Sequence, residues 1–330
     1  MTTQSPTAMT SPQATVEPEF ASMVINLLRT RGRLRDANIA KYTTPAHLRM
    51  FRDAFIHKSF ARHGHYELME FLGDARIDSI VVQYLHRRFP QVKREGVLTP
   101  IKHKLKSGKQ LGQFAHELGW FKWARFRPGV GVESKKIPFQ SIVGCGEILF
   151  PVPSDQVTEQ HVRDLMNKEF PPGAAFDSDK FVEFDEYTAL LEDIFEAFIG
   201  TIIEVIDNVE PMGVSHAVAY NVVSSFLDEI DIHLTREWSV DVVTRLKEMF
   251  YDGNKWSYTN SLEVIHDKPL CEHTATLYWY PKGDKTQSDR NAEVFAVAKG
   301  RSKPLAIKRV ATVGLDRALK MNYTEKPWVV

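Results

Sequence analysis

The sequence predicts a mostly helical domain followed by a small α+β domain. Apolar residues recur at three-to-four spacing from about residue 46 to 123 and again from 186 to 230, which is typical of amphipathic helices. After Trp238 the pattern changes to a helix, three alternating stretches and a last helix. The length of 330 residues suits two domains, and a hydrophobic content of 43% is enough for a large core.

In the first domain, one long apolar stripe begins at Leu68, Phe71 and Leu72, and we expect these side chains to be buried. Ile77, Ile80, Val81, Tyr84 and Leu85 continue the stripe. Pro90 ends this helix, because proline breaks a helix interior. Further helices are expected at 106–118, where Gly119 ends the helix, and at 186–208 and 214–230.

The predicted boundaries follow changes in composition. Residues 1–22 are rich in Thr, Ser and Pro and are expected to form a disordered tail. The helical domain covers 23–235, with a loop-rich insertion at about 127–182 that holds a short helix near 159–168. The second domain covers 238–322, with helices at 240–250 and 304–321 around strands at 257–265, 274–280 and 293–298, and residues 323–330 form a tail.

Composition excludes several classes of protein. The longest apolar run is too short for a bilayer-spanning helix, so no membrane association is expected. Two cysteines, Cys145 and Cys271, cannot form a disulfide framework or a thiolate metal cage. We interpret this as an intracellular protein of a reducing compartment, without a signal that separates cytoplasm from nucleus.

Two short segments cluster carboxylates. Helical geometry places Glu67, Glu70 and Asp74 on one face, and Asp193 and Glu196 on one face of a second helix. Such acids are often only the solvated faces of amphipathic helices. Facing each other, they would form an oxygen-only pocket for a hard cation, Mg²⁺ or possible substitute Mn²⁺, which suits phosphodiester hydrolysis.

The first segment, Glu67-Leu-Met-Glu-Phe-Leu-Gly-Asp74, closely resembles the signature of the ribonuclease III family. Four further segments match the family in order: Ile56–Phe60, Phe89-Pro90, Glu95–Thr99 and Asp193-Ile-Phe-Glu-Ala-Phe-Ile-Gly200. The resemblance implies a ribonuclease III endonuclease domain over about 45–230. Toward the C-terminus, Gly300-Arg-Ser-Lys303 and 306–311 more loosely resemble a double-stranded-RNA-binding domain.

The resemblance implies roles for individual residues. Glu70, Asp74, Asp193 and Glu196 fall on the catalytic and metal positions, and Glu67 on the acid at the dimer junction and cleft edge. The expected activity is Mg²⁺-dependent cleavage of double-stranded RNA by a homodimer, which leaves 5′ phosphates, 3′ hydroxyls and short 3′ overhangs. Expected RNA contacts in the second domain are Lys303, Arg301, Lys308 and His273.

Local charge is consistent with these roles although the formal net charge is +0. Residues 87–109 hold eight Lys and Arg against one acid, 299–320 hold seven against one, and 183–210 hold nine acids without a basic residue. The alternative is a non-catalytic protein that binds or sequesters double-stranded RNA, or a ribosome-associated scaffold. Retention of all the acids favours the enzyme, because clustered unpaired acids are electrostatically costly. A di-iron helical protein would need Glu-x-x-His pairs that Asp193 and Glu196 do not provide.

Overall fold

The computed structural model describes most of the two predicted domains. The described residues are 16–61, 64–126, 185–211, 213–249, 256–257, 263–267, 270–279, 293–300, 303–325 and 328. The predicted insertion at 127–182, its short helix, Arg301 and most of the predicted N-terminal tail lie outside these residues. Within the described part of the chain, no helix is long and apolar enough to cross a membrane.

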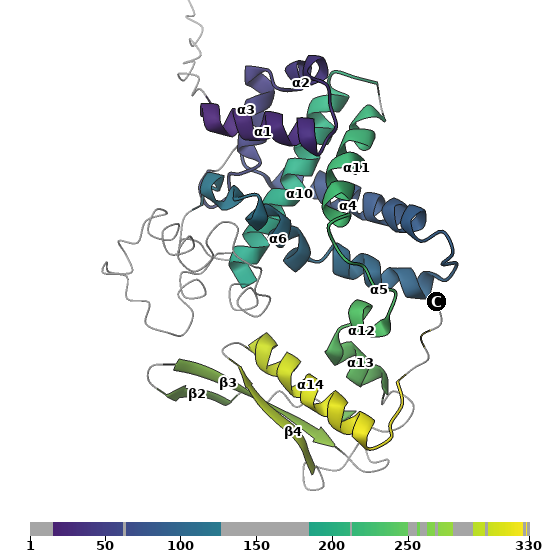
Figure 1. The fold of residues 1–330 in the computed structure, drawn as a ribbon. Coiled ribbons are helices and arrows are strands. Elements are labelled where there is room, and N and C mark those ends of the chain that lie inside the picture. The colour runs from purple at the N-terminus through teal and green to yellow at the C-terminus, as the bar shows by residue number, and fades with distance from the viewer. Residues whose placement is uncertain are drawn as a thin grey trace, which may run out of the picture.

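The first domain is a bundle of helices around one central helix, α10 (Figure 1). Its helices are α1 (Pro18–Thr30), α2 (Asp36–Tyr42), α3 (Pro45–Asp53), α4 (Glu67–Arg88), α5 (Glu95–Leu105), α6 (Gly108–Glu117), the 3₁₀ turn η1 (Trp120–Trp123), α10 (Asp185–Asp207) and α11 (Val214–Leu227). The predicted helices at 106–118, 186–208 and 214–230 are confirmed to within a few residues.

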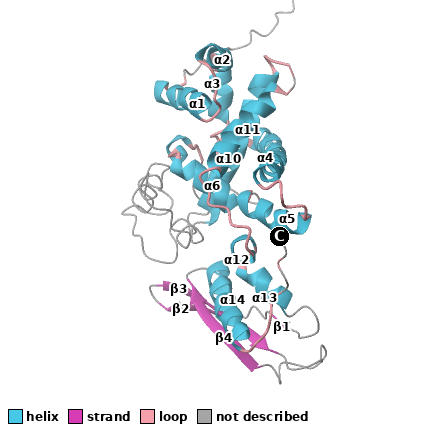
Figure 2. Cartoon of the chain, turned by 45° about the vertical axis from the view of Figure 1, so that its right-hand side comes forward, coloured by secondary structure: helices cyan, strands magenta, loops and turns pink. Residues whose placement is uncertain are grey.

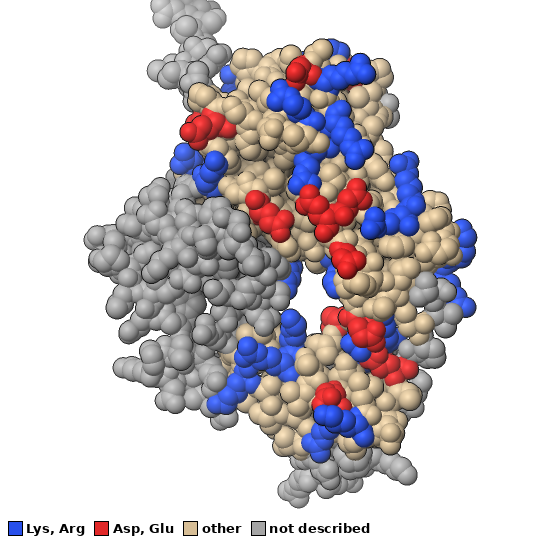
Figure 3. All heavy atoms as spheres, viewed as in Figure 1, with Lys and Arg blue, Asp and Glu red and all other residues tan. Residues whose placement is uncertain are grey.

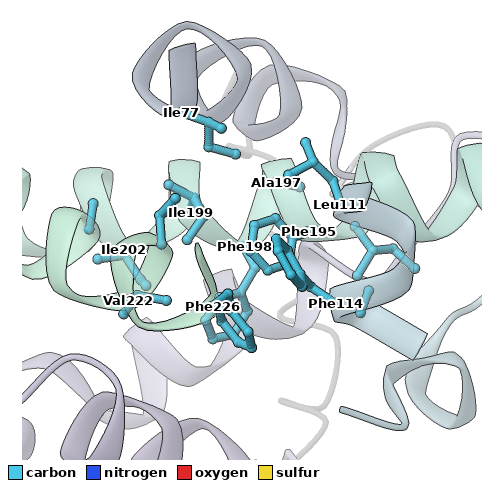
Figure 4. Packing of buried hydrophobic residues seen from close by; sticks show 14 of the residues in the cluster. Ile77, Leu111, Phe114, Phe195, Ala197, Phe198, Ile199, Ile202, Val222 and Phe226 are labelled. Carbon is cyan, nitrogen blue, oxygen red and sulfur yellow. The ribbon is translucent and has the colours of Figure 1, made fainter. Parts of the chain in front are cut away.

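Aromatic side chains fix α10 in the centre of this bundle. Phe195 and Phe198 are fully buried and point away from α4 (Figure 4). Phe195 packs against Phe114 and Phe226, and the Phe198 ring packs against Trp120. The Phe114 and Phe226 rings stack with centroids 5.0 Å apart, and Phe195 meets Phe226 edge-on at 5.6 Å. Because the aromatic face of α10 is covered in this way, its other face, which carries the acids, is turned toward α4.

The second domain has the predicted order of helix, antiparallel sheet and helix. Helices α13 (Val242–Met249) and α14 (Lys303–Lys320) pack on one face of the sheet (Figure 2). β3 (Leu270–Trp279) is central, with β4 (Glu293–Gly300) on one edge. The other edge holds β1 (Trp256–Ser257) and β2 (Glu263–Asp267), so the predicted strand at 257–265 is present as two pieces.

The C-terminal residues connect the two domains. Glu325 accepts a hydrogen bond from Arg245 Nε at 2.8 Å, and the Trp328 indole donates to the Leu234 carbonyl at 2.8 Å. The short helix α12 (Arg236–Ser239) also contacts the first domain, where the Lys104 ammonium lies 3.8 Å from the Trp238 ring centroid. Glu325 and Trp328 therefore belong to the folded structure, whereas the sequence placed them in a tail.

Two further expectations are wrong. Helix α1 begins at Pro18, inside the predicted tail, because Phe20 is fully buried in the core. The start of the predicted apolar stripe is exposed: Leu68 is 65%, Phe71 72% and Leu72 36% accessible. Helical spacing identifies an apolar stripe, but it does not show which part of the stripe is covered by another segment. Only the stripe residues from Ile77 onward face the core.

Candidate active site

The site is built where α4 and α10 cross, and two glycines set the distance between these helices. A Cβ atom added to Gly73 would lie 1.8 Å from the Glu196 carbonyl oxygen, and one added to Gly200 would lie 2.0 Å from the Met69 oxygen. Only glycine permits the two backbones to approach this closely. The crossing therefore presses the first turns of α4, with Glu70, directly against the turn of α10 that carries Asp193 and Glu196.

Three of the predicted acids come together at this crossing. Glu70, Asp193 and Glu196 each offer a carboxylate oxygen, and these oxygens all lie within 4.8 Å of one another. Asp193 is 3% and Glu196 6% exposed, while Glu70 is partly exposed at the rim. The structure thus joins acids more than 120 residues apart in the chain, as the two carboxylate segments predicted.

The fourth acid, Asp74, lies beside this group and is paired differently. It shares a hydrogen bond with Glu196. One of its oxygens also lies 2.9 Å from the ammonium of Lys106, which contacts Asp78 at 3.4 Å. Although burial alone would lower the pKa of Lys106, the hydrogen bond and attraction of Asp74 and Asp78 raise it. Asp74 is therefore a link between the three-acid group and the basic segment 87–109.

Glu67 lies outside the three-acid group. Its carboxylate accepts a hydrogen bond from Lys58 at 2.7 Å, and this bond lowers the pKa of Glu67. A position at the edge of the site fits the prediction that Glu67 belongs to the cleft rim and not to the metal ligands.

Burial makes the site chemically unusual. Removal from water, followed by the proximity of Asp74, Glu192 and Asp193, raises the pKa of Glu196 to about 9. At neutral pH the carboxyl of Glu196 therefore keeps a proton when only protein groups surround it. A bound divalent cation would replace that proton, since its charge compensates several carboxylates at once.

Two residues of the site were not singled out from the sequence. Tyr66 directly precedes α4 and donates its hydroxyl hydrogen to Asp193 Oδ2 at 2.8 Å. Lys106 was counted only as part of a basic stretch. The one available signal for Tyr66 was its place immediately before the carboxylate signature.

The second-domain candidates are only partly placed. Lys303 and Lys308 are exposed on the first turns of α14. His273, directly before the predicted strand at 274–280, lies within β3, where the register pairs it with Gly300.

The two crossed central helices bring three carboxylates together, two of them buried, in a cluster that could hold a metal ion. Residues 67–204 match the family model of the ribonuclease III domain. The chain therefore contains a ribonuclease III domain and is an endoribonuclease, and hence a hydrolase.

Two viral relatives align over most of this chain. A protein of Invertebrate iridescent virus 6 named "Putative ribonuclease 3" is 24% identical over 320 residues, which cover 92% of this chain and 89% of that protein. A protein of Frog virus 3 with the same name is 26% identical and covers 81% of this chain, but the alignment spans only 55% of the viral protein. Among solved structures, the nuclease domain of ribonuclease III from Campylobacter jejuni aligns with 63% of this chain and 98% of its own, at 20% identity and a TM-score of 0.35.

Proposed function

We propose that this ribonuclease requires Mg²⁺, with Mn²⁺ as a substitute, and cleaves double-stranded RNA. The observation that carries the proposal is the approach of three carboxylate oxygens to within 4.8 Å with two of the side chains buried. An all-oxygen, all-carboxylate donor set fits a hard divalent cation. Without such a cation, the clustered buried acids would destabilise the fold by desolvation and mutual repulsion, with no structural gain to offset this.

In the proposed mechanism, Glu70, Asp193 and Glu196 hold the cation at the helix crossing and Asp74 completes the acidic wall. The cation, when bound, activates water and neutralises charge on the phosphodiester. The protein residues hold their oxygens in place, and the half-exposed position of Glu70 and Asp74 leaves one side open to a substrate. Hydrolysis is proposed to leave 5′ phosphate and 3′ hydroxyl ends.

The distribution of charge supports an RNA substrate. On the face seen in Figure 3, acidic side chains gather over the centre of the first domain, and Lys and Arg side chains lie around them. A groove of about 1330 Å³ runs between the domains, and Arg94, Lys104 and Lys109 line it from the first domain and Lys308 from the second. Glu237, Asp241 and Glu248 also line the groove, so its positive charge lies mainly on the four basic residues named above, which would attract a phosphate backbone.

The homodimer belongs to the same proposal. Leu68, Phe71 and Leu72 form an exposed apolar patch on α4, which we call the α4 patch. The patch surrounds Glu70 in sequence, so a partner that covers it would lie next to the acid group. A two-fold arrangement would use the patch of both copies and place two sites in one assembly, one for each RNA strand, with short 3′ overhangs as the result.

The α4 patch can be tested with Phe71→Asp. Full burial of a phenylalanine stabilises by about 1.5–3 kcal/mol, and a two-fold interface loses this twice, so the dimer dissociation constant is expected to rise by more than about 100-fold. Sedimentation velocity at micromolar concentration measures the change. Val214→Asp, at an exposed valine on α11, is the matched control. Dimers of Phe71→Asp as stable as those of the unmodified protein would exclude the α4 patch as the interface.

We further propose that the second domain binds double-stranded RNA through Lys303, Arg301, Lys308 and His273. Lys303 is exposed at the first position of α14, where the helix dipole also favours phosphate. His273 lies at the same end of the domain as Lys303. It pairs with Gly300 in the register of β3 and β4, and Gly300 lies against the first turn of α14.

Lys303→Ala is expected to weaken duplex binding equally for unrelated sequences and to lower the slope of log K against log salt by about one. Fluorescence anisotropy of a labelled duplex over a salt series measures both effects. Lys320→Ala removes a lysine at the opposite end of α14 that is paired with Asp316 at 2.6 Å, and should change neither. An unaltered salt slope in Lys303→Ala would contradict the assignment.

The whole proposal is tested by incubating the purified protein with a long labelled RNA duplex, with matched single-stranded RNA as the comparison. Cleavage of the duplex in Mg²⁺ or Mn²⁺ but not in EDTA is expected, with ligatable 5′ phosphates and short 3′ overhangs on sequencing. Binding of the duplex without cleavage in either cation would replace the proposal with the sequestering or scaffold role.

A further inference from the structure

A single tyrosine connects the segment before α4 to the acid group on α10. Tyr66 is 2% exposed, and its hydroxyl hydrogen-bonds to Asp193 Oδ2 at 2.8 Å, across 127 residues of sequence. Asp193 is also a member of the three-acid group with Glu70 and Glu196, so this hydrogen bond reaches the group directly.

The tyrosine itself is firmly held. Its backbone N–H donates to the Ile56 carbonyl at 3.1 Å, and its own carbonyl accepts from the backbone N–H of Glu70 at 2.8 Å. The His57 ring lies edge-on to the phenol ring, with centroids 5.6 Å apart. The phenol hydroxyl is therefore presented to Asp193 from a rigid position, which a mobile surface side chain could not provide.

The hydrogen bond limits how Asp193 can turn. A carboxylate rotates readily about its last torsion angle, and its two oxygens can exchange roles. The hydrogen bond from Tyr66 to Oδ2 therefore restricts rotation of the Asp193 carboxylate. Hydrogen bonds from neighbouring groups to metal-binding carboxylates commonly tune affinity in this way.

We infer that Tyr66 is a positioning residue that orients Asp193 for divalent-cation binding. This inference rests on the proposed function, because it assigns a role to Tyr66 at the proposed metal site. In this role Tyr66 would act on the cation through its hydrogen bond to Asp193.

The helix that follows Tyr66 contains a matched control. Tyr84 is 4% exposed, lies in α4, and donates its hydroxyl hydrogen to Asp228 Oδ1 at 3.0 Å. Tyr66→Phe and Tyr84→Phe therefore remove the same atom and the same kind of tyrosine–aspartate hydrogen bond. Only the first of these bonds reaches the acid group, so a general loss of stability affects both variants and a loss of cation binding affects one.

The experiment measures Mn²⁺ binding to the full-length protein without RNA, by isothermal titration calorimetry and by the electron paramagnetic resonance signal of free Mn²⁺. Tyr66→Phe is expected to raise the Mn²⁺ dissociation constant by about 10–100-fold, the usual effect of removing a partner of a metal ligand. Tyr84→Phe is expected to bind Mn²⁺ like the unmodified protein. Thermal unfolding of the metal-free variants checks that the two substitutions cost similar stability.

Cleavage kinetics give a second readout. In Tyr66→Phe, the Mg²⁺ concentration for half-maximal cleavage should rise by the same factor, whereas the RNA concentration for half-maximal rate stays unchanged. Unaltered Mn²⁺ binding in Tyr66→Phe, or an equal loss in Tyr84→Phe, would overturn the role of Tyr66 and leave the proposed metal site standing. Absence of Mn²⁺ binding by the unmodified protein would overturn both.

Discussion

Replacing Glu196 by glutamine is expected to lower the rate of duplex cleavage by more than about 100-fold. This loss exceeds the roughly 10–100-fold that is usual when a residue hydrogen-bonded to a metal ligand, and not the ligand itself, is replaced. Glutamine keeps the size of the side chain and removes the charge that would hold the cation. The pKa of about 9 means that Glu196 is already protonated in the metal-free protein at neutral pH, so the neutral amide fits the same surroundings. Fold, dimer and duplex affinity should therefore be retained.

Single-turnover cleavage with excess protein measures the loss, and anisotropy measures the retained binding. The control is Glu204→Gln, a carboxylate two turns further along α10 that accepts a hydrogen bond from Asn208 at 3.3 Å. A thermal readout is independent of RNA: Mg²⁺ should raise the melting temperature of the unmodified protein but not of Glu196→Gln, because ligands stabilise only the states that bind them. Full activity of Glu196→Gln would remove this residue from the site.

Gly200→Ala is expected to lower the free energy of unfolding strongly. Its added methyl group would lie 2.0 Å from the backbone oxygen of Met69, and backbone atoms cannot rotate aside as a side chain can. Overpacking of a core costs about 1–3 kcal/mol, and we expect a loss in free energy of unfolding near the upper end. Urea unfolding monitored by tryptophan fluorescence measures it.

The same substitution should also disturb the site, because α4 and α10 must separate to admit the methyl group. Separation moves Glu70 away from Asp193 and Glu196, so Mn²⁺ binding is expected to weaken in the fraction that remains folded. Gly96→Ala is the matched control. Nothing lies within 4 Å of its added carbon, and alanine favours the helix by about 0.5–1 kcal/mol. Equal stability of Gly200→Ala and Gly96→Ala would contradict the close crossing.

The sequence by itself determined the helices and the chemistry they carry. Spacing at i and i+3 or i+4 puts Glu70 with Asp74, and Asp193 with Glu196, on single helix faces, and this follows from helix geometry alone. The change of hydrophobic period after Trp238, from helical spacing to alternation, likewise predicts a second domain with a sheet. Local rules suffice for these features because each depends on residues within a few turns or one strand of each other.

Only the tertiary structure decided which faces meet. The exposed α4 patch and the buried stripe from Ile77 onward belong to one helix with similar apolar residues, and they differ in whether another segment covers them. Tyr66 and Lys106 joined the site for the same reason, since their partners lie on elements distant in sequence. Periodicity describes a helix relative to its own axis, whereas burial, hydrogen bonds across the chain and the pKa of Glu196 depend on the close approach that Gly73 and Gly200 permit.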